Sequence, residues 1–345
     1  MLKRLTDIEL PKSRLCHLRQ EELEQVLQTN CPGEVHTIGK SREGRSLYGV
    51  SIGLGKQTVS IIAGAHADEP TGPVTALLLP WLLETHFSAL LDRFTFHIIP
   101  QMNPDGAEQN RRWFAAEPDF KTYVSAVLRE EPGDDVEFGF GTGATVRPEC
   151  RAAMTFLEPH GPFAAHFSLH SMPYNEGVWF LLCPNWQERA ADLTTKLTAY
   201  CGAAGFVMHD VDRHGEKGFS RIGPGFSTTP NSTAMRSFFE AQGQPETAAK
   251  FHPSSMEFIS SLGGDPLCMV SEVPLFLLGN ETPNLVNPAY FRFKQELDAA
   301  VKENKLEALI TRYDVKPVSL EQQVRLQFAM ILIGLNNLQR QEYAL

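Results

Sequence analysis

The sequence predicts an α/β domain in which a mostly parallel or mixed sheet is flanked by helices. Short apolar runs of strand-like composition alternate with helix-like segments along the chain, and this alternation is typical of such sheets. The 345 residues are 42% hydrophobic and 21% charged, and they contain no internal repeat. A chain of this size and composition can bury a sizeable core, so we expect one large domain.

No stretch of the sequence has the composition of a linker between separate domains. We expect residues 1–33 to form a helical lead-in, residues 34–305 the main domain, and residues 306–345 C-terminal helices packed on it. Within the lead-in, the charged amphipathic pattern of 19–29 predicts a helix, which the turn-forming residues 30–33 end.

Further elements follow from apolar runs and from the turn residues that bound them. Strands are expected at 34–38, 46–52, 59–63, 94–100, 165–169, 178–182 and 268–273. Helices are expected at 74–85, near 120–130, and at 148–158, 187–201, 287–305 and 320–344. Residues 210–255 are rich in Gly, Pro, Ser and Thr, and a structureless stretch of that length is usually a functional loop region.

The composition disfavours several classes of function. A net charge of −10 disfavours general binding of nucleic acids. No run approaches the roughly 20 apolar residues of a membrane helix, and the first residues contain no secretory apolar core. The six cysteines form no CxxC pair, which indicates reduced thiols rather than a disulfide framework. We expect a cytoplasmic protein that binds neither nucleic acid nor membrane, and the oligomeric state stays open.

The chain is organised around an apolar run, 59–65, that ends abruptly in His66. Glu69 follows three residues later, and Pro70 favours a loop over a regular helix at this point. An imidazole and a carboxylate at this spacing in a tight turn can bind one metal ion. The same pair also occurs by chance on protein surfaces, so this stretch predicts no more than half of a zinc site.

A second apolar run, 165–169, delivers His170 in the same way. Functional groups gather at the carboxyl ends of parallel strands, so strands that end at His66, Asn103, His170 and Glu272 would bring these residues together. Two histidines and a glutamate form a three-ligand catalytic zinc set with an open fourth position. We therefore expect one zinc ion per chain, although residue identity alone does not exclude another divalent metal.

These residues resemble the zinc metallocarboxypeptidases of the carboxypeptidase A-like family. The resemblance covers about residues 34–280, in the order that the family shows. It implies an α/β fold with a mixed, mostly parallel, twisted, eight-stranded sheet and helices on both faces, and it makes 34–305 the catalytic domain. The matching motifs are His66-x-x-Glu69, Asn103-Pro-Asp-Gly106, Leu169-His170-Ser171 and Ser271-Glu272, with Gly44-Arg-Ser-Leu47 and Arg147-Pro-Glu149-Cys-Arg-Ala152 beside them.

The resemblance implies a role for each matching residue. His66, Glu69 and His170 would bind zinc, which polarises the scissile carbonyl and acidifies a water molecule. Glu272 would take the proton of that water and pass it to the leaving amine. Arg112 would stabilise the developing oxyanion, with Arg111 as the competing choice, and Asp135 would orient a zinc-binding histidine; Asp105 is expected to form a turn.

The departures from the family concern substrate recognition. Where the family binds the terminal carboxylate with an Asn-Arg pair, this chain has Glu137 and Phe138. Phe138 cannot bind a carboxylate, and an anionic Glu137 would repel one. Met256 replaces the substrate-covering tyrosine, and Tyr174 is a candidate for supplying a phenol instead.

Three explanations stay open at this point. Arg213 or Arg221 could bind the carboxylate from the long loop region. The substrate could instead lack an α-carboxylate there, and Glu137 would then suit a cationic or hydrogen-bond-donating group. The stretch could also be misaligned by a few residues.

The sequence thus favours a zinc-dependent hydrolase that cleaves a peptide or small amide by a carboxypeptidase-like mechanism. The first alternative is an N-acyl amino acid deacylase of the aspartoacylase and succinylglutamate desuccinylase type, which shares the arrangement of metal ligands. The Asn103-Pro-Asp-Gly106 motif favours the peptidase. The second alternative is a non-catalytic binding protein on the same fold.

Overall fold

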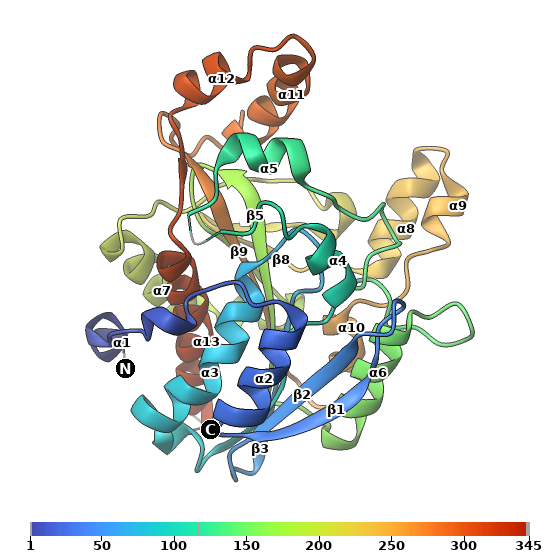
Figure 1. The fold of residues 1–345 in the computed structure, drawn as a ribbon, viewed down its shortest axis with the longest axis vertical. Helices are drawn as coiled ribbons and strands as arrows, with labels where there is room; N and C mark the ends of the chain where they lie inside the picture. Colours follow the sequence, from blue (N-terminus) through green and yellow to red (C-terminus); the bar gives the residue numbers. More distant parts are fainter. Residues whose placement is uncertain (1, 116, 343–345) are drawn as a thin grey trace.

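A computed structural model describes residues 2–115 and 117–342, and its centre is a mixed sheet (Figure 1). The sheet has ten strands, in the order β1-β2-β4-β3-β5-β9-β6-β8-β7, with β10 paired to β9. The strands are β1 (Glu34–Lys40), β2 (Ser46–Ile52), β3 (Gln57–Ala63), β4 (Phe94–Ile99), β5 (Ala165–Asn175), β6 (Trp179–Leu182), β7 (Arg221–Gly223), β8 (Phe226–Thr228), β9 (Leu267–Leu278) and β10 (Val315–Pro317).

The predicted α/β class is confirmed, but the strand count and the share of parallel pairs differ from the expectation. The four central strands β4, β3, β5 and β9 run parallel to one another. Most of the outer pairs are antiparallel, so "mostly parallel" describes only the centre. The strands β7, β8 and β10 have three residues each, which is too short for an apolar pattern to reveal them.

Helices cover both faces of this sheet. The helices α3, α7 and α13 pack together on one face, whereas α6 contacts β1 and β2, and α10 contacts β5, on the other. No helix in residues 2–115 and 117–342 is long and apolar enough to cross a membrane. The helices are α1 (Leu2–Asp7), α2 (Gln20–Asn30), α3 (Thr71–His86), α4 (Pro104–Gln109), α5 (Phe120–Ala126), α6 (Pro148–Leu157), α7 (Ala191–Ala203), α8 (Ser232–Ala241), α9 (Pro245–Ala248), α10 (Ser255–Ser261), α11 (Ala289–Lys302), α12 (Leu306–Tyr313) and α13 (Leu320–Glu342).

Residues 210–255 are not structureless, and the expectation of one long loop is wrong. The segment contains β7 and β8, which belong to the sheet, and α8 and α9, which lie at the right of Figure 1. Its apolar residues join an aromatic cluster made by Phe138, Phe239 and Phe251 with Ala248. Because these elements are short and separated by glycines and prolines, composition alone resembles that of a loop.

The last helix belongs to the core. Figure 1 shows α11 and α12 at one end of the molecule, whereas α13 runs along the sheet beside α3. On α13, Val324, Phe328, Ile331 and Leu335 are fully buried. Gly334 lies so close to the Phe167 ring of β5 that a Cβ atom there would come within 2.8 Å of it. The C-terminal residues therefore complete one face of the sheet.

A buried glutamine connects α13 to the two strands at the centre of the sheet. Gln327 Nε2 donates to the carbonyl oxygen of His170 on β5, at 3.1 Å, and to Ser271 Oγ on β9, at 3.1 Å. Its Oε1 accepts a hydrogen bond from Thr75 Oγ1 of α3 at 2.5 Å. The amide thus satisfies polar groups of three other elements in an apolar setting, where unpaired groups are costly.

Replacing Gln327 by leucine should lower the free energy of unfolding by about 2–4 kcal/mol, because it leaves several buried polar groups without partners. Thermal and chemical denaturation of the metal-free protein would measure the change. The control is Gln25→Leu on the exposed surface of α2, where a change within about 0.5 kcal/mol is expected. Equal stability of the two variants would contradict the role given to Gln327.

Candidate metal centre and cleft

The predicted metal ligands come from two neighbouring parallel strands, one set from the loop after β3 and the other from the middle of β5, which continues past His170 to Asn175 instead of ending there as expected. His66 and Glu69 lie in the loop that joins β3 to α3, and His170 lies within β5. Gly64 begins this loop with φ of +66°, a left-handed conformation that glycine adopts without strain. Because β3 and β5 pair in parallel, Ala63 lies opposite Leu169, and the loop is delivered beside His170.

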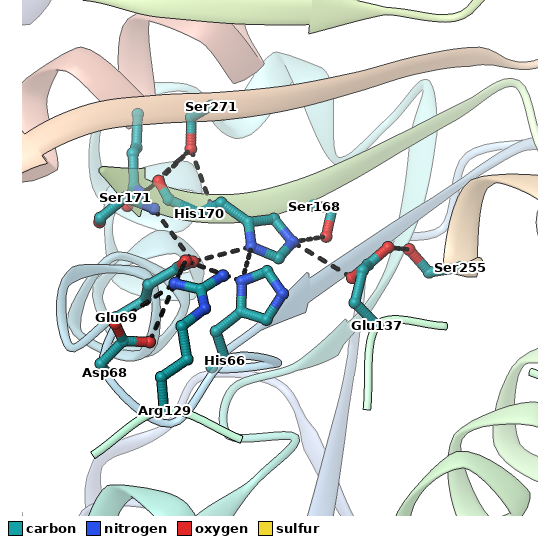
Figure 2. A network of polar contacts seen from close by, with 12 residues as sticks. His66, Asp68, Glu69, Arg129, Glu137, Ser168, His170, Ser171, Ser255 and Ser271 are labelled. Atoms are coloured by element: carbon teal, nitrogen blue, oxygen red, sulfur yellow. Dashed lines mark hydrogen bonds and ion pairs between the residues drawn. The ribbon is translucent and has the colours of Figure 1, made fainter. Parts of the chain in front are cut away.

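The three side chains converge on one point (Figure 2). His66 Nδ1 lies 2.7 Å from Glu69 Oε1, and His170 Nδ1 lies 2.8 Å from Glu69 Oε2. The two Nδ1 atoms are 3.0 Å apart. One ligand atom from each residue lies within 4.8 Å of the others, so this group can hold a metal ion.

The donor set fits a divalent metal because of the way His170 is oriented. Its Nε2 lies 2.9 Å from Ser168 Oγ and 3.2 Å from a carboxylate oxygen of Glu137. We infer from this carboxylate that Nε2 carries the proton, which leaves the lone pair on Nδ1, directed at His66 and Glu69. Two imidazole nitrogens and a carboxylate that meet in this way provide the His2Glu set of a zinc site with an open fourth position.

Glu137 therefore lies behind His170, rather than in the place expected for a substrate-binding residue. Its second oxygen accepts a hydrogen bond from Ser255 Oγ at 3.0 Å, and Ser255 in turn contacts the buried His166. Asp135, the residue expected to orient a histidine, instead accepts a hydrogen bond from the backbone NH of Phe138 at 3.2 Å. The structure thus places Glu137 where Asp135 was expected, and Asp135 in a turn.

Burial and mutual attraction oppose each other in the pKa values of this group. Burial raises the pKa of Glu69, but His66 and His170 outweigh it and hold the value well below normal. Burial lowers the pKa of His170, but Glu69 and Glu137 outweigh it and raise the value well above normal. In the metal-free protein a proton therefore takes the place of the cation, so acid should compete with metal binding.

The arginine beside the metal ligands is Arg129, not Arg112 or Arg111. Arg129 Nη1 lies 3.1 Å from Asp68 Oδ1 and 3.2 Å from Glu69 Oε1, and its side chain is 45% exposed. Arg112 is exposed and lines neither lobe of the cleft, and Arg111 donates to the carbonyl oxygen of Leu18. Spacing after the Asn103 motif selected the wrong arginine, because the segment after α5 folds back over the site and brings Arg129 there.

Glu272 lies on β9 directly opposite His170 in the β5–β9 register. Its carboxylate has no hydrogen bond or ion pair with any residue that the structure describes, and it lines the cleft. Burial, with the nearby Glu69 carboxylate, raises the pKa of Glu272 to about 8, while His170 and Arg129 act in the opposite direction. A carboxyl group with this pKa can exchange a proton near neutral pH.

A cleft with two lobes opens beside the metal ligands, and Arg129, Arg213, Lys217 and Glu272 line both lobes. The larger lobe has a volume of about 970 Å³. The smaller lobe, of about 390 Å³, has an apolar wall that includes four phenylalanines, and charged residues and histidines make up the other half of its lining. Of the remaining predicted substrate residues, Tyr174 lines the larger lobe and Phe138 and Met256 line the smaller one.

The two loop arginines proposed as carboxylate ligands are both paired within the protein. Arg221 makes two hydrogen bonds to the carboxylate of Asp210, at 2.7 and 3.0 Å, and lines neither lobe. Arg213 lines both lobes but forms an ion pair with Glu216. Lys217, which had no distinguishing pattern in the sequence, is a cation that lines both lobes without such a pair among the described residues.

Comparison with known proteins agrees with this geometry. A sequence model of the zinc carboxypeptidase family matches residues 21–175, a range that contains all three metal ligands. Carboxypeptidase M of Mus musculus is 29% identical over 168 residues, which make up 42% of this chain and 36% of that protein. Zinc carboxypeptidase A 1 of Drosophila melanogaster is 34% identical over 109 residues, or 26% of this chain and 25% of that protein. These matches thus span about a third and a quarter of those relatives.

Solved structures share the fold over most of the chain. A metallo-carboxypeptidase from Burkholderia cenocepacia has a TM-score of 0.50 and 19% identity, over 91% of this chain and 67% of that one. A structure from Shewanella amazonensis that is described as a metallopeptidase has a TM-score of 0.53 and 15% identity, over 92% and 91%. The predicted resemblance to zinc carboxypeptidases and the fold class are therefore confirmed.

Replacing Glu137 by glutamine should weaken metal binding roughly 10- to 100-fold, because the charged acceptor that holds the tautomer and orientation of His170 is lost. Competition with a chromogenic chelator would measure the affinity. Asp135→Asn is the matched control, since it keeps an acceptor for the turn, and it should leave the affinity unchanged. If the Asp135 variant bound metal more weakly and the Glu137 variant bound it normally, Asp135 rather than Glu137 would be the residue that orients His170.

The metal-free protein should lose stability as the pH rises through Glu272's titration range. Between the ordinary pKa of 4.5 and about 8, the folded state retains a proton that the unfolded state has released. Metal-free Glu272→Gln should therefore nearly match the wild type near pH 4.5 and exceed its stability by about 5 kcal/mol above pH 8. Denaturation across this pH range would measure the difference, and a constant difference at all pH values would contradict the raised pKa.

Proposed function

We propose that this chain is a zinc-dependent hydrolase that cleaves a peptide or amide bond by a carboxypeptidase-like mechanism. The observation that supports it best is the convergence of His66, Glu69 and His170 beside an unpaired Glu272 in a cleft. Zinc held by these three residues would polarise the scissile carbonyl group and lower the pKa of a water molecule. The zinc carboxypeptidase family match supports this choice of metal.

Glu272 is the general base and then the general acid of the proposed reaction. It lies across the β5–β9 pair from His170, so a water molecule at the metal site would be near its carboxylate. Glu272 takes one proton from the attacking water and delivers it to the nitrogen of the leaving amine, so the proton count balances. Its raised pKa suits a group that must both accept and donate a proton near neutral pH.

Arg129 is the cation that stabilises negative charge on the carbonyl oxygen during attack. It lines both lobes, and both oxygens of the buried Asp68 carboxylate, at 3.1 and 3.2 Å, hold its guanidinium in place. A preorganised charge next to the reacting carbonyl lowers the barrier because it needs no rearrangement during the reaction. We assign this role to Arg129 in place of Arg112.

The cleft favours a peptide over a very small amide as the substrate. Its larger lobe, of about 970 Å³, lies at the upper end of the range of ligand pockets, so it has room for several residues. Deacylation of N-acyl amino acids, the first alternative, needs only a small pocket. A non-catalytic binding protein would have no use for the unpaired carboxyl group of Glu272.

We further propose that the protein works in a reducing compartment, the cytoplasm being our expectation. All six cysteines are free thiols, and four of them are buried. Two of the buried ones lie side by side, Cys183 directly after β6 and Cys268 on the neighbouring β9, and the Cys268 NH donates to Cys183 Sγ at 3.2 Å, yet they form no disulfide. The net charge of −10 supports a substrate other than nucleic acid.

Elemental analysis and a substrate panel test the proposal. We expect one zinc per chain and hydrolysis that a chelator abolishes, with peptides preferred over N-acyl amino acids in the panel. Glu272→Gln should retain the zinc and lose at least about 100-fold in kcat, since it can no longer accept a proton. Steady hydrolysis of N-acyl amino acids but not of peptides would select the deacylase. If the zinc-loaded wild type hydrolyses no member of the panel, the result would favour the non-catalytic binding protein.

Arg129→Met should lower kcat about 100- to 1000-fold while the zinc content stays at one per chain, because the charge beside the carbonyl oxygen is lost. The matched control is Arg112→Met, which changes an exposed arginine outside the cleft and should leave kcat unchanged. Steady-state kinetics on the best peptide of the panel would measure both. A large loss of kcat in Arg112→Met, with an unchanged kcat in Arg129→Met, would show that Arg112 has the role expected from the sequence.

A further inference from the structure

Lys217 is a cation of the cleft whose charge is not neutralised by a carboxylate in the described part of the chain. It lines both lobes, together with Arg129 and Arg213. Those two arginines are held in ion pairs by acidic side chains of the protein. Lys217 shares the smaller lobe with the metal ligands His66 and His170.

An aromatic cluster holds the lysine side chain in place. Lys217 Nζ lies 4.4 Å from the centroid of the Phe238 ring and 5.4 Å from that of Phe239. Phe239 stacks on Phe251, with the centroids 5.2 Å apart, and Phe251 packs edge-on against Phe138. Contacts between an ammonium group and aromatic faces stabilise the cation without neutralising it.

The backbone at Lys217 is in a conformation that lysine seldom adopts. Its φ is +57° and its ψ +15°, which is the left-handed region and costs roughly 1 kcal/mol for a residue with a Cβ atom. Hydrogen bonds hold the turn: Gly215 NH donates to Phe219 O at 2.8 Å, and Thr228 Oγ1 donates to Gly218 O at 2.7 Å. Strain of this kind, maintained at the wall of a cleft, is typical of functional positions.

The position from which the family pattern would bind a carboxylate is not available for that purpose. Glu137 points at His170 from behind, and Phe138 is part of the aromatic cluster. Lys217 approaches the same lobe from the segment between β6 and β7, above this cluster. An unpaired and partly buried ammonium group is a strong site for an anion, because a charge-assisted hydrogen bond would replace solvent that burial has removed.

We propose that Lys217 binds a carboxylate of the substrate next to the scissile bond, while the adjoining side chain of the substrate occupies the smaller lobe against the aromatic cluster. This inference rests on the proposed function, since it assigns the substrate of the same site. The carboxylate has two possible sources, the terminal α-carboxylate and an acidic side chain. Lys294 and Lys302 at the larger lobe also have no ion pair among the described residues, so this lobe adds two further cations. Acidic residues line the smaller lobe as well, so the attraction of an anion depends on the position of Lys217 and not on the net charge of the lining.

The burial of Lys217 is consistent with this role. Burial, with the nearby Arg213, lowers the pKa of Lys217 below its usual value. A carboxylate that approaches would favour the charged form again and gain attraction in a site from which solvent is partly excluded.

The experiment compares the wild type with Lys217→Met, which keeps the apolar stem and removes the charge, on three peptides of otherwise equal sequence. One has a free C-terminal carboxylate and a neutral last residue, one has an amidated terminus and a neutral last residue, and one has an amidated terminus and a glutamate there. Lys217→Met should raise KM about 10- to 100-fold on at least one carboxylate peptide and leave the neutral amidated peptide unchanged.

Two further variants make the result specific. Lys217→Arg keeps the charge and should retain most of the affinity for the affected peptide. Lys56→Met removes an exposed charge from a turn outside the cleft and should change none of the three KM values. If the KM of Lys217→Met rises only on the free-acid peptide, the α-carboxylate is the bound group. If it rises only on the glutamate peptide, the bound group is the side-chain carboxylate. An equal rise in KM on all three peptides, or an unchanged KM on all of them, overturns the proposal.

Calorimetric binding of the same peptides to the metal-free protein separates this inference from the proposed function. The wild type should bind a carboxylate peptide more tightly than Lys217→Met does. This difference in affinity is expected even if the zinc-loaded protein hydrolyses no peptide. If no peptide is hydrolysed but the difference in peptide affinity remains, the proposed hydrolase function is refuted and Lys217 is still supported as an anion-binding site. Active, chelator-sensitive enzyme without any difference in KM or binding would refute the role of Lys217 alone.

Discussion

Two imidazole nitrogens held 3.0 Å apart, both facing one buried carboxylate, are the constraint on which the rest of the structure depends. Such a group is unfavourable unless a cation, either protons or a metal ion, occupies the space between its members, because the desolvated charges have no other partner. The neighbouring elements are arranged to prevent the side chains from turning away. Glu137 fixes His170 through Nε2, and Gln327 holds the backbone of the same residue through its carbonyl oxygen.

This restraint draws on distant parts of the chain. β5 and β9 position His170 and Glu272 opposite each other, and α13, from the far end of the sequence, hydrogen-bonds to both strands. A second buried sequence of contacts connects Ser60 of β3 through His166 and Ser255 to Glu137. Because every member of this network has a partner, the geometry of the metal site is coupled to the packing of the core.

The substrate side of the cleft follows from the same arrangement. Once Glu137 is used to orient His170, it cannot also bind substrate, and Phe138 beside it joins an aromatic cluster. A cation that recognises an anionic substrate must then come from elsewhere, and Lys217 reaches the lobe over that cluster from a strained turn. The departures from the family at positions 137 and 138 are therefore linked to each other and to the position of Lys217.

The sequence by itself determined the strands that carry the metal ligands, because apolar runs that end in a polar residue are local signals. It likewise determined the pairing of His66 with Glu69, which are three residues apart, and the fold class. The three-residue strands β7, β8 and β10 carried too little pattern to be seen. Only the tertiary structure decided that Arg129, rather than Arg112, lies at the site, and that Glu137, rather than Asp135, contacts His170. It also decided the place of Lys217 in the cleft. These contacts join residues far apart in the chain, so their partners are set by how loops fold over the sheet, which no local spacing encodes.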